Sequence, residues 1–266
     1  MEPRRARALR QQDRLLTAPV GSTEERRRPL RPGHVLVTLE DLLILTWTVP
    51  ERALRARLNC GLEPWSSGGC ARVSALLFRN RRLRPAWIRV PRLSSCQLNL
   101  RSYVLDPETG RRGCVFFHGP YLDRPLLARI SALVLSVPFC CLPFSIGVEQ
   151  GEPLRWRADA PDGRVRIRAR AAEADPALDA EALDLLTNPH SGVVEAGGIC
   201  RRWSIWHRNQ TLRTMAVEEV RIEPLERLFP ERDGPTGLLV DSIDYEVYLP
   251  ARKMGLTSAP RTPRRS

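Results

Sequence analysis

The sequence predicts an α+β fold rich in β-structure, with an antiparallel barrel-like sheet and a few short helices. Most segments alternate apolar and polar residues with the two-residue period of a β-strand. Only two or three segments carry a helical pattern, and no internal repeat is visible. Roughly eight to ten strands are expected in all, which is enough to form a closed or nearly closed barrel.

The first predicted elements lie between His34 and Arg92. Val35 to Val49 alternates and then becomes continuously apolar, as a strand that enters a core does. Pro50 then opens a short helix that runs through Leu58, because proline suits the first turn of a helix. Cys70 to Arg79 is the next predicted strand. The arginine-rich stretch from Asn80 to Arg92 is expected to be an exposed connection.

The clearest local signal is a hairpin between Cys96 and His118, where two alternating runs flank a turn at Asp106 to Arg112. A helix from Arg124 to Ser136 should follow. The first strand of the hairpin has one polar and one apolar face. The polar face carries Gln97, Asn99, Arg101 and Tyr103, and the apolar face carries Leu98, Leu100 and Val104.

The second half of the chain is predicted to form further strands around one short helix at Asp179 to Leu186. A tight turn at Asn209-Gln210 should join two of these strands. The predicted strands are Phe139–Glu149, Leu154–Ala158, Arg164–Ala171, Cys200–Arg208, Thr211–Ile222 and Leu238–Leu249. The third has four arginines on one face, and five acidic residues follow it. A self-compensating outer surface is therefore preferred over a phosphate-binding track.

The formal charge of +12 is concentrated at the two ends of the chain. Residues 1–32 carry nine arginines against four acidic residues, and residues 251–266 carry five basic residues and no acid. The span between them is close to neutral, so its net charge does not indicate a nucleic-acid partner. We expect a disordered basic leader at 1–32, a single barrel domain at 33–252 and a disordered basic tail at 253–266. The sequence indicates no oligomeric state.

Seven cysteines without a CxxC pair, and no apolar signal core in residues 1–30, predict a reduced, cytoplasmic protein. The four histidines are widely spaced, so we expect neither a metal site nor a cofactor. The stretch from Ile130 to Val148 has no charged residue. Pro138 and Pro143 interrupt it, which predicts a buried helix leading into a buried strand and no membrane span.

Three stretches follow one another in a specific order and spacing: Leu39–Pro50, Gln97–Val104 and Gly113–Phe117. Together they resemble the YqjF-like family of uncharacterised bacterial proteins, a domain of unknown function in the acetoacetate-decarboxylase-like superfamily. The resemblance extends over about Val35 to Arg252. It implies an acetoacetate-decarboxylase-like β-barrel around a largely apolar cavity, into which a few polar side chains project.

The resemblance also implies that one mechanism is excluded. Acetoacetate decarboxylase forms a Schiff base with a lysine next to a proline, and the corresponding region here is Val137-Pro138-Phe139. Phenylalanine cannot form an imine, and the only lysine of this chain is Lys253, near the C-terminus. Many relatives carry a glutamate where this chain has Gln97, so another titratable group is absent.

Arg101 is the best ligand-binding candidate if the cavity persists. A guanidinium stays charged and can hold a carboxylate or phosphate through two hydrogen bonds. Tyr103, Asn99 and Gln97 share its strand face and complete the predicted ligand-binding set. The alternative is that this polar face points to solvent, while the apolar face of the strand points into the core.

The sequence assigns no catalytic residue. His118 and His207 could each act as a general base near neutral pH, although for each of them a packed or surface histidine is the preferred interpretation. The resemblance favours His207, because relatives carry a histidine near that point. Other signatures, such as GxSxG, HExxH and phosphate-binding loops, are missing.

Three functions therefore stay open. The first is binding of a small anionic or keto-acid-like molecule in a barrel cavity without Schiff-base chemistry. The second is a lyase or hydrolase of keto or enol acids that uses His118 or His207 without an imine. The third is an interaction module whose basic tails bind a partner.

Overall fold

The computed structural model describes residues 16–17, 27–87, 93–135, 137–173, 180–208 and 210–254. Most of the predicted leader and tail lies outside these residues. Residues 27–32 are described, and they lie against the barrel through Arg27 and Arg28. The barrel domain therefore includes chain that the sequence assigns to the leader.

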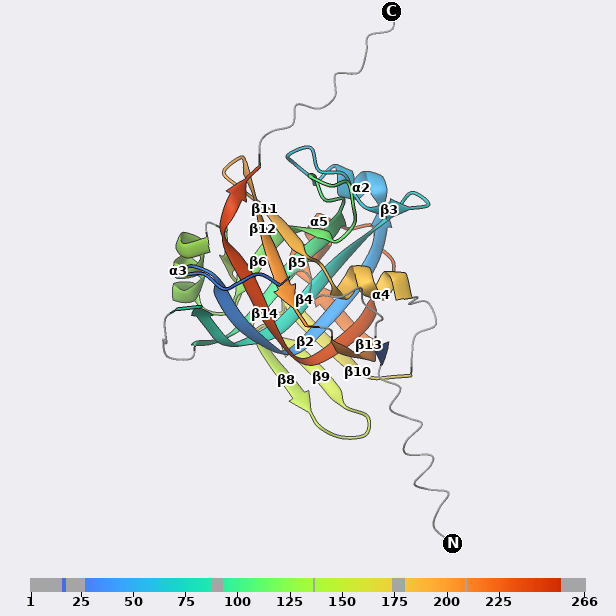
Figure 1. Cartoon of the computed structure of the whole chain (residues 1–266). Coiled ribbons are helices and arrows are strands. Elements are labelled where there is room, and N and C mark those ends of the chain that lie inside the picture. The colour runs from blue at the N-terminus through green and yellow to red at the C-terminus, as the bar shows by residue number, and fades with distance from the viewer. Residues whose placement is uncertain are drawn as a thin grey trace, which may run out of the picture.

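Within the described residues, seven strands form a closed barrel (Figure 1). They are, in chain order, β2 (Val35–Pro50), β4 (Cys70–Pro85), β5 (Leu93–Val104), β6 (Cys114–Leu122), β11 (Ser191–Ala196), β12 (Ile199–His207) and β14 (Thr236–Lys253). The ring runs β12-β11-β6-β5-β4-β2-β14 and closes where β14 pairs with β12. Every pairing in the ring is antiparallel except that of β11 with β6. The β-rich α+β barrel fold predicted from the sequence is confirmed.

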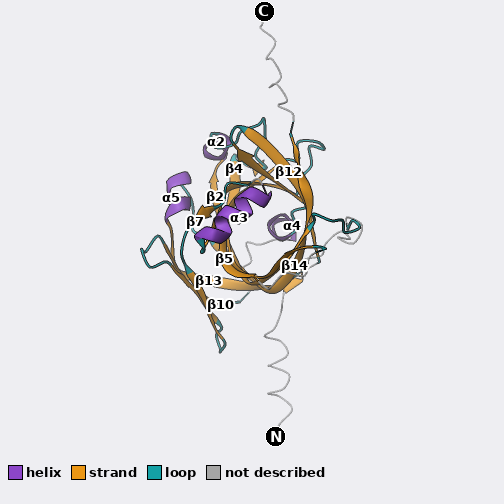
Figure 2. Ribbon diagram, turned by 90° about the vertical axis from the view of Figure 1, so that its left-hand side faces the viewer, coloured by secondary structure: helices purple, strands orange, loops and turns teal. Residues whose placement is uncertain are grey.

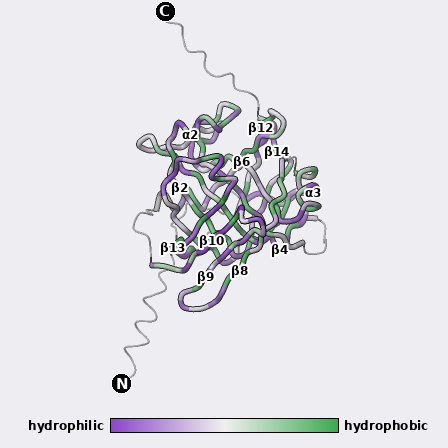
Figure 3. The backbone as a smooth tube through the Cα atoms, turned by 180° about the vertical axis from the view of Figure 1, so that it is seen from behind, coloured by the Kyte–Doolittle hydropathy of each residue, from purple (hydrophilic) through white to green (hydrophobic). Residues whose placement is uncertain are grey.

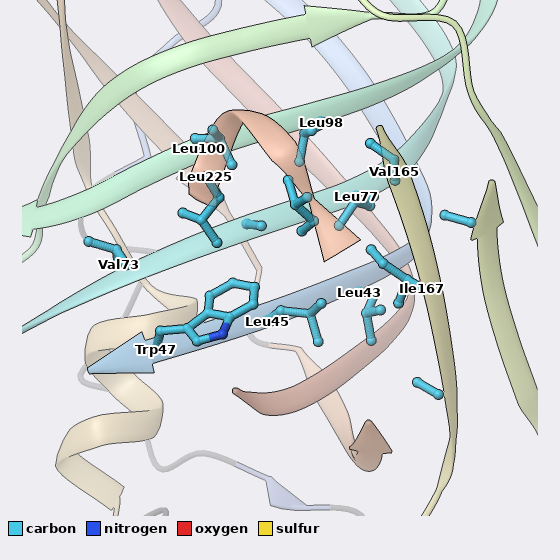
Figure 4. Close-up of a cluster of buried hydrophobic side chains, with 14 of the residues drawn as sticks. Leu43, Leu45, Trp47, Val73, Leu77, Leu98, Leu100, Val165, Ile167 and Leu225 are labelled. Atoms are coloured by element: carbon cyan, nitrogen blue, oxygen red, sulfur yellow. The ribbon is translucent and has the colours of Figure 1, made fainter. Parts of the chain in front are cut away.

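A second group of strands leaves the ring through β14 and forms an arm. The arm consists of β13 (Thr211–Ile222), β10 (Val165–Ala171), β9 (Arg155–Asp159) and β8 (Ser145–Glu149), in that order from β14. Two of its strands, β8 and β9, protrude from the body as a hairpin (Figure 3). Inward-facing arm residues such as Val165 and Ile167 share one buried cluster with Leu43, Leu77 and Leu98 of the barrel (Figure 4). Trp156 of the arm belongs to the same cluster. This arm covers the outer face of β2, β4 and β5, so those strands are buried on both faces.

Four helices and three short strands complete the described chain. They are α2 (Glu51–Arg55), α3 (Pro125–Leu135), α4 (Ala180–Thr187), α5 (Glu223–Leu228), β1 (Leu16–Thr17), β3 (Ser66–Ser67) and β7 (Cys140–Cys141). α3 and α4 lie at opposite ends of the barrel, and Figure 2 looks into the barrel past α3. α4 fills its end, because Leu183, Leu185 and Leu186 join a buried cluster inside the ring. The other end retains open space.

Most of the predicted elements are present. The Val35 strand, the helix after Pro50, the hairpin between Cys96 and His118 and the helices near 124–136 and 179–186 are all found. Strand β4 continues to Pro85, into the segment expected to be a loop, because it pairs with β2 up to that residue. No helix among the described residues is long and apolar enough to cross a membrane.

The predicted pairing across Asn209-Gln210 is wrong. β12 pairs with β11 and β14, whereas β13 pairs with β10, β14 and β1. The chain leaves the ring at this point and enters the arm, so the two consecutive strands belong to different parts of the sheet. Strand β11, which the sequence analysis does not identify, occupies one edge of β12.

The arginine stripe of β10 is neutralised, as expected. Its acidic partners are not those of the segment that follows it. Its ion pairs are Arg164–Asp162, Arg166–Glu219, Arg168–Asp159 and Arg170–Glu218. Three of these acids stand on the neighbouring strands β9 and β13. Cross-strand proximity supplies the compensation, so the stripe is a neutral outer surface.

One cysteine prediction is also corrected. Cys60, in the loop after α2, and Cys200 of β12 form a disulfide, and the other five cysteines are free. The sequence separation of 140 between the two partners hides this contact in the sequence. The expected cytoplasmic location stays a prediction.

Candidate functional site

A cavity of about 170 Å³ lies inside the barrel at the end covered by α3. Its wall is largely apolar and comes from β2, β4, β5, β6, β12, β14 and α3, with Val137 and Phe139 from the segment after that helix. The polar lining residues are Asn80, Gln97, Asn99, Arg101, Ser131 and Tyr245. No aspartate, glutamate, histidine or lysine lines the cavity among the described residues. The site therefore combines an apolar wall with hydrogen-bond donors and one fixed positive charge.

The polar wall is built mainly by β5, whose alternation points Gln97, Asn99 and Arg101 into the barrel. Their neighbours Leu98 and Leu100 point outwards into the core under the arm. The sequence analysis left open whether the polar face lines a cavity or the apolar face packs into the core, and both are found. The polar face is enclosed, and the apolar face packs into a different core.

Three side-chain amides form a chain of hydrogen bonds along this wall. Asn80 Nδ2 of β4 donates to Gln97 Oε1 at 2.8 Å, and Gln97 Nε2 donates to Asn99 Oδ1 at 2.8 Å. Asn80 Nδ2 also donates to Ser95 Oγ at 3.1 Å. The last side chain in this series of hydrogen bonds is Asn99, whose Nδ2 is left as a donor. Asn99 is the neighbour of Arg101 on the same face of β5.

Arg101 is buried, with 4% of its surface exposed. Its Nη2 donates to Tyr103 Oη at 3.2 Å and to the backbone carbonyl of Leu186 in α4, and its Nε has no hydrogen-bond partner. Among the described residues no carboxylate lies within ion-pair distance of Arg101. An uncompensated buried charge is costly, so this arrangement suits an anion that arrives from outside.

The hydroxyl of Tyr103 accepts a hydrogen bond from Arg101, and Tyr103 itself does not line the cavity. It is fully buried, and its hydroxyl bonds to Ser74 Oγ at 2.8 Å, which in turn bonds to Thr46 Oγ1 at 2.7 Å. The structure therefore gives Tyr103 the geometry of a positioning residue, whereas Gln97, Asn99 and Arg101 face the open space.

Tyr245 of β14 lines the cavity and was not singled out from the sequence. Burial raises the pKa of Tyr245 to about 12, against an opposing effect of Arg101. The phenol therefore stays protonated at neutral pH and can donate a hydrogen bond. Tyr245, Val247 and Leu249 alternate along β14 and all line the cavity from one face of the strand. This alternation is the sequence pattern from which Tyr245 could have been identified.

The two histidines do not line the cavity. His207 is buried beside it, with its ring 4.6 Å from that of Tyr245 and its Nδ1 2.8 Å from the carbonyl of Arg208. His118 lies on the opposite side of the barrel wall, where β6 has an irregular register, and packs against Phe116 and Phe229. The structure thus separates His118 from Arg101 and brings His207 only to the second layer of residues around the cavity.

His118 gives the protein a defined sensitivity to acid. Burial lowers its pKa to about 4, and Arg57 acts in the same direction. Between about pH 6.5, the value of an unfolded histidine, and pH 4, the unfolded chain binds a proton that the folded chain does not, so stability falls with falling pH. We expect the free energy of unfolding to lose on the order of 3 kcal/mol over this window. Denaturant titrations across the window should show a smaller loss in His118→Phe, and an equal loss in both proteins would contradict the assignment.

Lys253, the only lysine of the chain, does not line the cavity. Lys253 is exposed at the end of β14, paired in the sheet with Arg201, whereas Val137 and Phe139 lie in the cavity wall. The region that the resemblance assigns to the Schiff-base lysine is therefore at the cavity but carries no amine. No three histidine, cysteine, aspartate or glutamate side chains of the described chain gather to hold a metal ion.

Comparison with known proteins agrees with this architecture. The sequence model of DUF2071, an uncharacterized conserved protein family, matches residues 37–241. No curated protein sequence matches the chain.

Solved structures share the fold at low sequence identity. Acetoacetate decarboxylase from Legionella pneumophila is 13% identical, with a TM-score of 0.55 over 93% of this chain and 95% of its own. For an acetoacetate decarboxylase-like enzyme from Sphingomonas wittichii RW1 the identity is 11% and the TM-score 0.54, over 83% of this chain and 92% of its own. The enduracididine biosynthesis enzyme MppR, complexed with pyruvate, is 13% identical with a TM-score of 0.54, over 91% of this chain and 98% of its own. These likenesses show the acetoacetate decarboxylase-like fold.

Proposed function

We propose that this chain, which belongs to the DUF2071 family of uncharacterized conserved proteins, binds a small organic anion in its barrel cavity. The anion is a carboxylate of the keto-acid kind with a partly apolar body. Arg101 holds the carboxylate, and Asn99 and Tyr245 donate hydrogen bonds to its other oxygens. Binding proceeds without a Schiff base, because no amine of the described residues lines the cavity.

One observation carries the proposal: Arg101 is buried, lines the cavity and has no carboxylate partner in the described chain. A guanidinium presents a planar set of donors that fits a carboxylate in two hydrogen bonds. The carboxylate would supply the missing negative charge in a region from which water is largely excluded. In this environment a charge-assisted hydrogen bond is stronger than it is in water.

The dimensions and lining of the cavity limit the ligand. Pockets for drug-sized molecules usually measure about 300–1,000 Å³, so a cavity of about 170 Å³ favours a smaller molecule. Residues such as Leu76, Phe78 and Phe117 supply an apolar surface for its body. Pyruvate, with which MppR forms a complex, is a keto acid of this small size, which supports the choice of keto acids as the first probes.

The alternative of a non-imine lyase or hydrolase receives no comparable support. A general base must come within hydrogen-bond reach of the proton that it removes. Neither His118 nor His207 lines the cavity, and Tyr245 stays protonated at neutral pH. We therefore propose a binding function and do not assign a reaction.

The proposal is tested by comparing carboxylates with neutral molecules of the same shape. Acetoacetate, pyruvate and benzoate are titrated by calorimetry beside acetoacetamide, pyruvamide and benzamide. At least one carboxylate should bind more tightly than its amide by about tenfold or more, because only the carboxylate compensates the charge of Arg101. Equal binding of every carboxylate and its amide, or no binding by any of them, would refute it.

A borohydride experiment separates binding from imine chemistry. Incubation with acetoacetate and borohydride, followed by mass spectrometry of the intact chain, should give no covalent adduct. An adduct at Lys253 would contradict the exclusion of Schiff-base chemistry.

A further inference from the structure

A second concave site lies on the outside of the barrel. It is a groove of about 910 Å³ where residues 27–34 cross β12 and β14. Its acidic and arginine lining residues are Arg27, Arg28, Arg31, Glu108, Arg202 and Arg252. We call this site the basic groove.

The segment that forms one wall of the basic groove is fixed to the barrel. Arg27 pairs with the buried carboxylate of Glu246 at 2.8 Å and lies 4.4 Å from the ring centre of Trp206. The backbone amide of Arg28 donates to the hydroxyl of Tyr248 at 3.0 Å. These contacts to β12 and β14 hold the segment against the sheet and give the groove a defined shape.

The charges of the basic groove are only partly neutralised within the chain. Five arginines line it against one acid, Glu108. Arg27 pairs with Glu246, and Arg202 pairs with Asp106 and, at 2.6 Å, with Glu108. Arg28, Arg31 and Arg252 have no ion pair with any described residue. The contrast with β10 is clear, because there each of four arginines has an acidic partner.

The basic groove is separate from the cavity, although the two share a wall. The pairing of β12 with β14 is interrupted between Arg202 and Ser204. At this irregular point, Trp203, Ile205 and Leu249 line both spaces. The charges of the groove stand on the outer side of this wall and Arg101 on the inner side, so each site can be altered without the other.

We propose that the basic groove binds a small molecule with at least two negative charges, as in a diphosphate or a phosphate ester with a second anionic group. Three unpaired guanidiniums on one open concave surface match several oxygens of such a group at once. A single carboxylate suits the buried Arg101 better, since Arg28, Arg31 and Arg252 are exposed, and hydration of an exposed charge weakens a single ion pair. The volume of the groove lies within the range of small-molecule sites.

A small ligand is favoured over nucleic acid by the distribution of charge on the barrel. The stripe of β10, which has the spacing to follow a phosphate chain, is neutralised. Arg28, Arg31 and Arg252 instead line one groove, which is bounded on one side by the fixed segment 27–34. A nucleic acid would instead require a continuous basic surface along its backbone.

The test uses inorganic pyrophosphate as the probe and the full-length chain. Calorimetry compares the wild type with the groove variant Arg28→Gln/Arg31→Gln/Arg252→Gln. A matched variant, Arg129→Gln/Arg155→Gln/Arg221→Gln, removes the same charge from exposed arginines outside the groove. We expect the groove variant to weaken pyrophosphate binding by about tenfold or more and the matched variant to change it by less than about twofold. Thermal unfolding confirms that both variants fold.

Several results would overturn the proposal. Equal weakening of pyrophosphate binding in both variants would show a diffuse charge effect. Absence of pyrophosphate binding in the wild type would contradict the proposed site. Tight, salt-dependent binding of a single-stranded DNA oligonucleotide that is lost in the groove variant and retained in the matched variant would assign the groove to nucleic acid instead. Arg101→Met should retain pyrophosphate binding, so failure of the cavity hypothesis leaves this proposal standing.

Discussion

Arg101→Met is expected to abolish binding of organic anions while leaving the barrel at least as stable as the wild type. The guanidinium is buried, lacks a carboxylate partner among the described residues and has an unpartnered Nε. Desolvation of such a charge costs several kcal/mol, whereas its charge-assisted hydrogen bond to the Leu186 carbonyl contributes about 1.5–3 kcal/mol. Tyr103 keeps its bond to Ser74 in the variant. Affinity for the tightest carboxylate should fall on the order of 100-fold, as measured by calorimetry, and the melting temperature should not fall.

Asn99→Asp provides the matched variant for this prediction. The new carboxylate would stand two residues from Arg101 on the same strand face and supply the negative charge internally. It should therefore exclude the ligand and raise the melting temperature. If Arg101→Met instead unfolds several degrees earlier and Asn99→Asp still binds the anion, Arg101 is a structural residue and the ligand site lies elsewhere.

The polar face of β5 shows how far the sequence determines the site. Alternation correctly groups Gln97, Asn99 and Arg101 on one face. It cannot say whether that face is enclosed, because enclosure depends on β12 and β14, which follow about a hundred residues later in the chain. The resemblance to a barrel family supplied that information. The ligand-binding role of these residues stays a prediction.

Other features escaped the sequence for a related reason. Local turn residues predicted a hairpin at Asn209-Gln210, but the long ladder between β12 and β14 takes the edge that β13 would need. The disulfide partners Cys60 and Cys200 approach only after the barrel closes. Arg27 finds Glu246 from 219 residues away, so a basic leader looked free in the sequence. Short-range patterns predicted the elements, whereas these contacts depend on topology.

Trp156→Ala should produce a large loss of stability, because Trp156 fixes the arm to the barrel. Its side chain is 1% exposed, and its Nε1 donates to the backbone carbonyl of Asp41 at 3.0 Å. Asp41 lies in β2 with φ of 53°, at an irregularity in the pairing of β2 with β4, and its carboxylate pairs with Arg79. Removing the indole leaves a cavity between two sheet layers and an unpaired carbonyl, so the free energy of unfolding should fall by about 3–5 kcal/mol in denaturant titrations.

Trp156→Phe separates the two contributions to this loss. Phenylalanine retains most of the apolar contact with neighbours such as Ile167 but cannot donate to Asp41, so it should lose about 1–2 kcal/mol. If alanine and phenylalanine cost the same, the hydrogen bond to Asp41 would outweigh packing. If alanine costs less than about 1 kcal/mol, the arm is not held to the barrel by this contact. The burial of Leu98 and Leu100 on β5 would then depend on other members of the same cluster, such as Leu225 of α5.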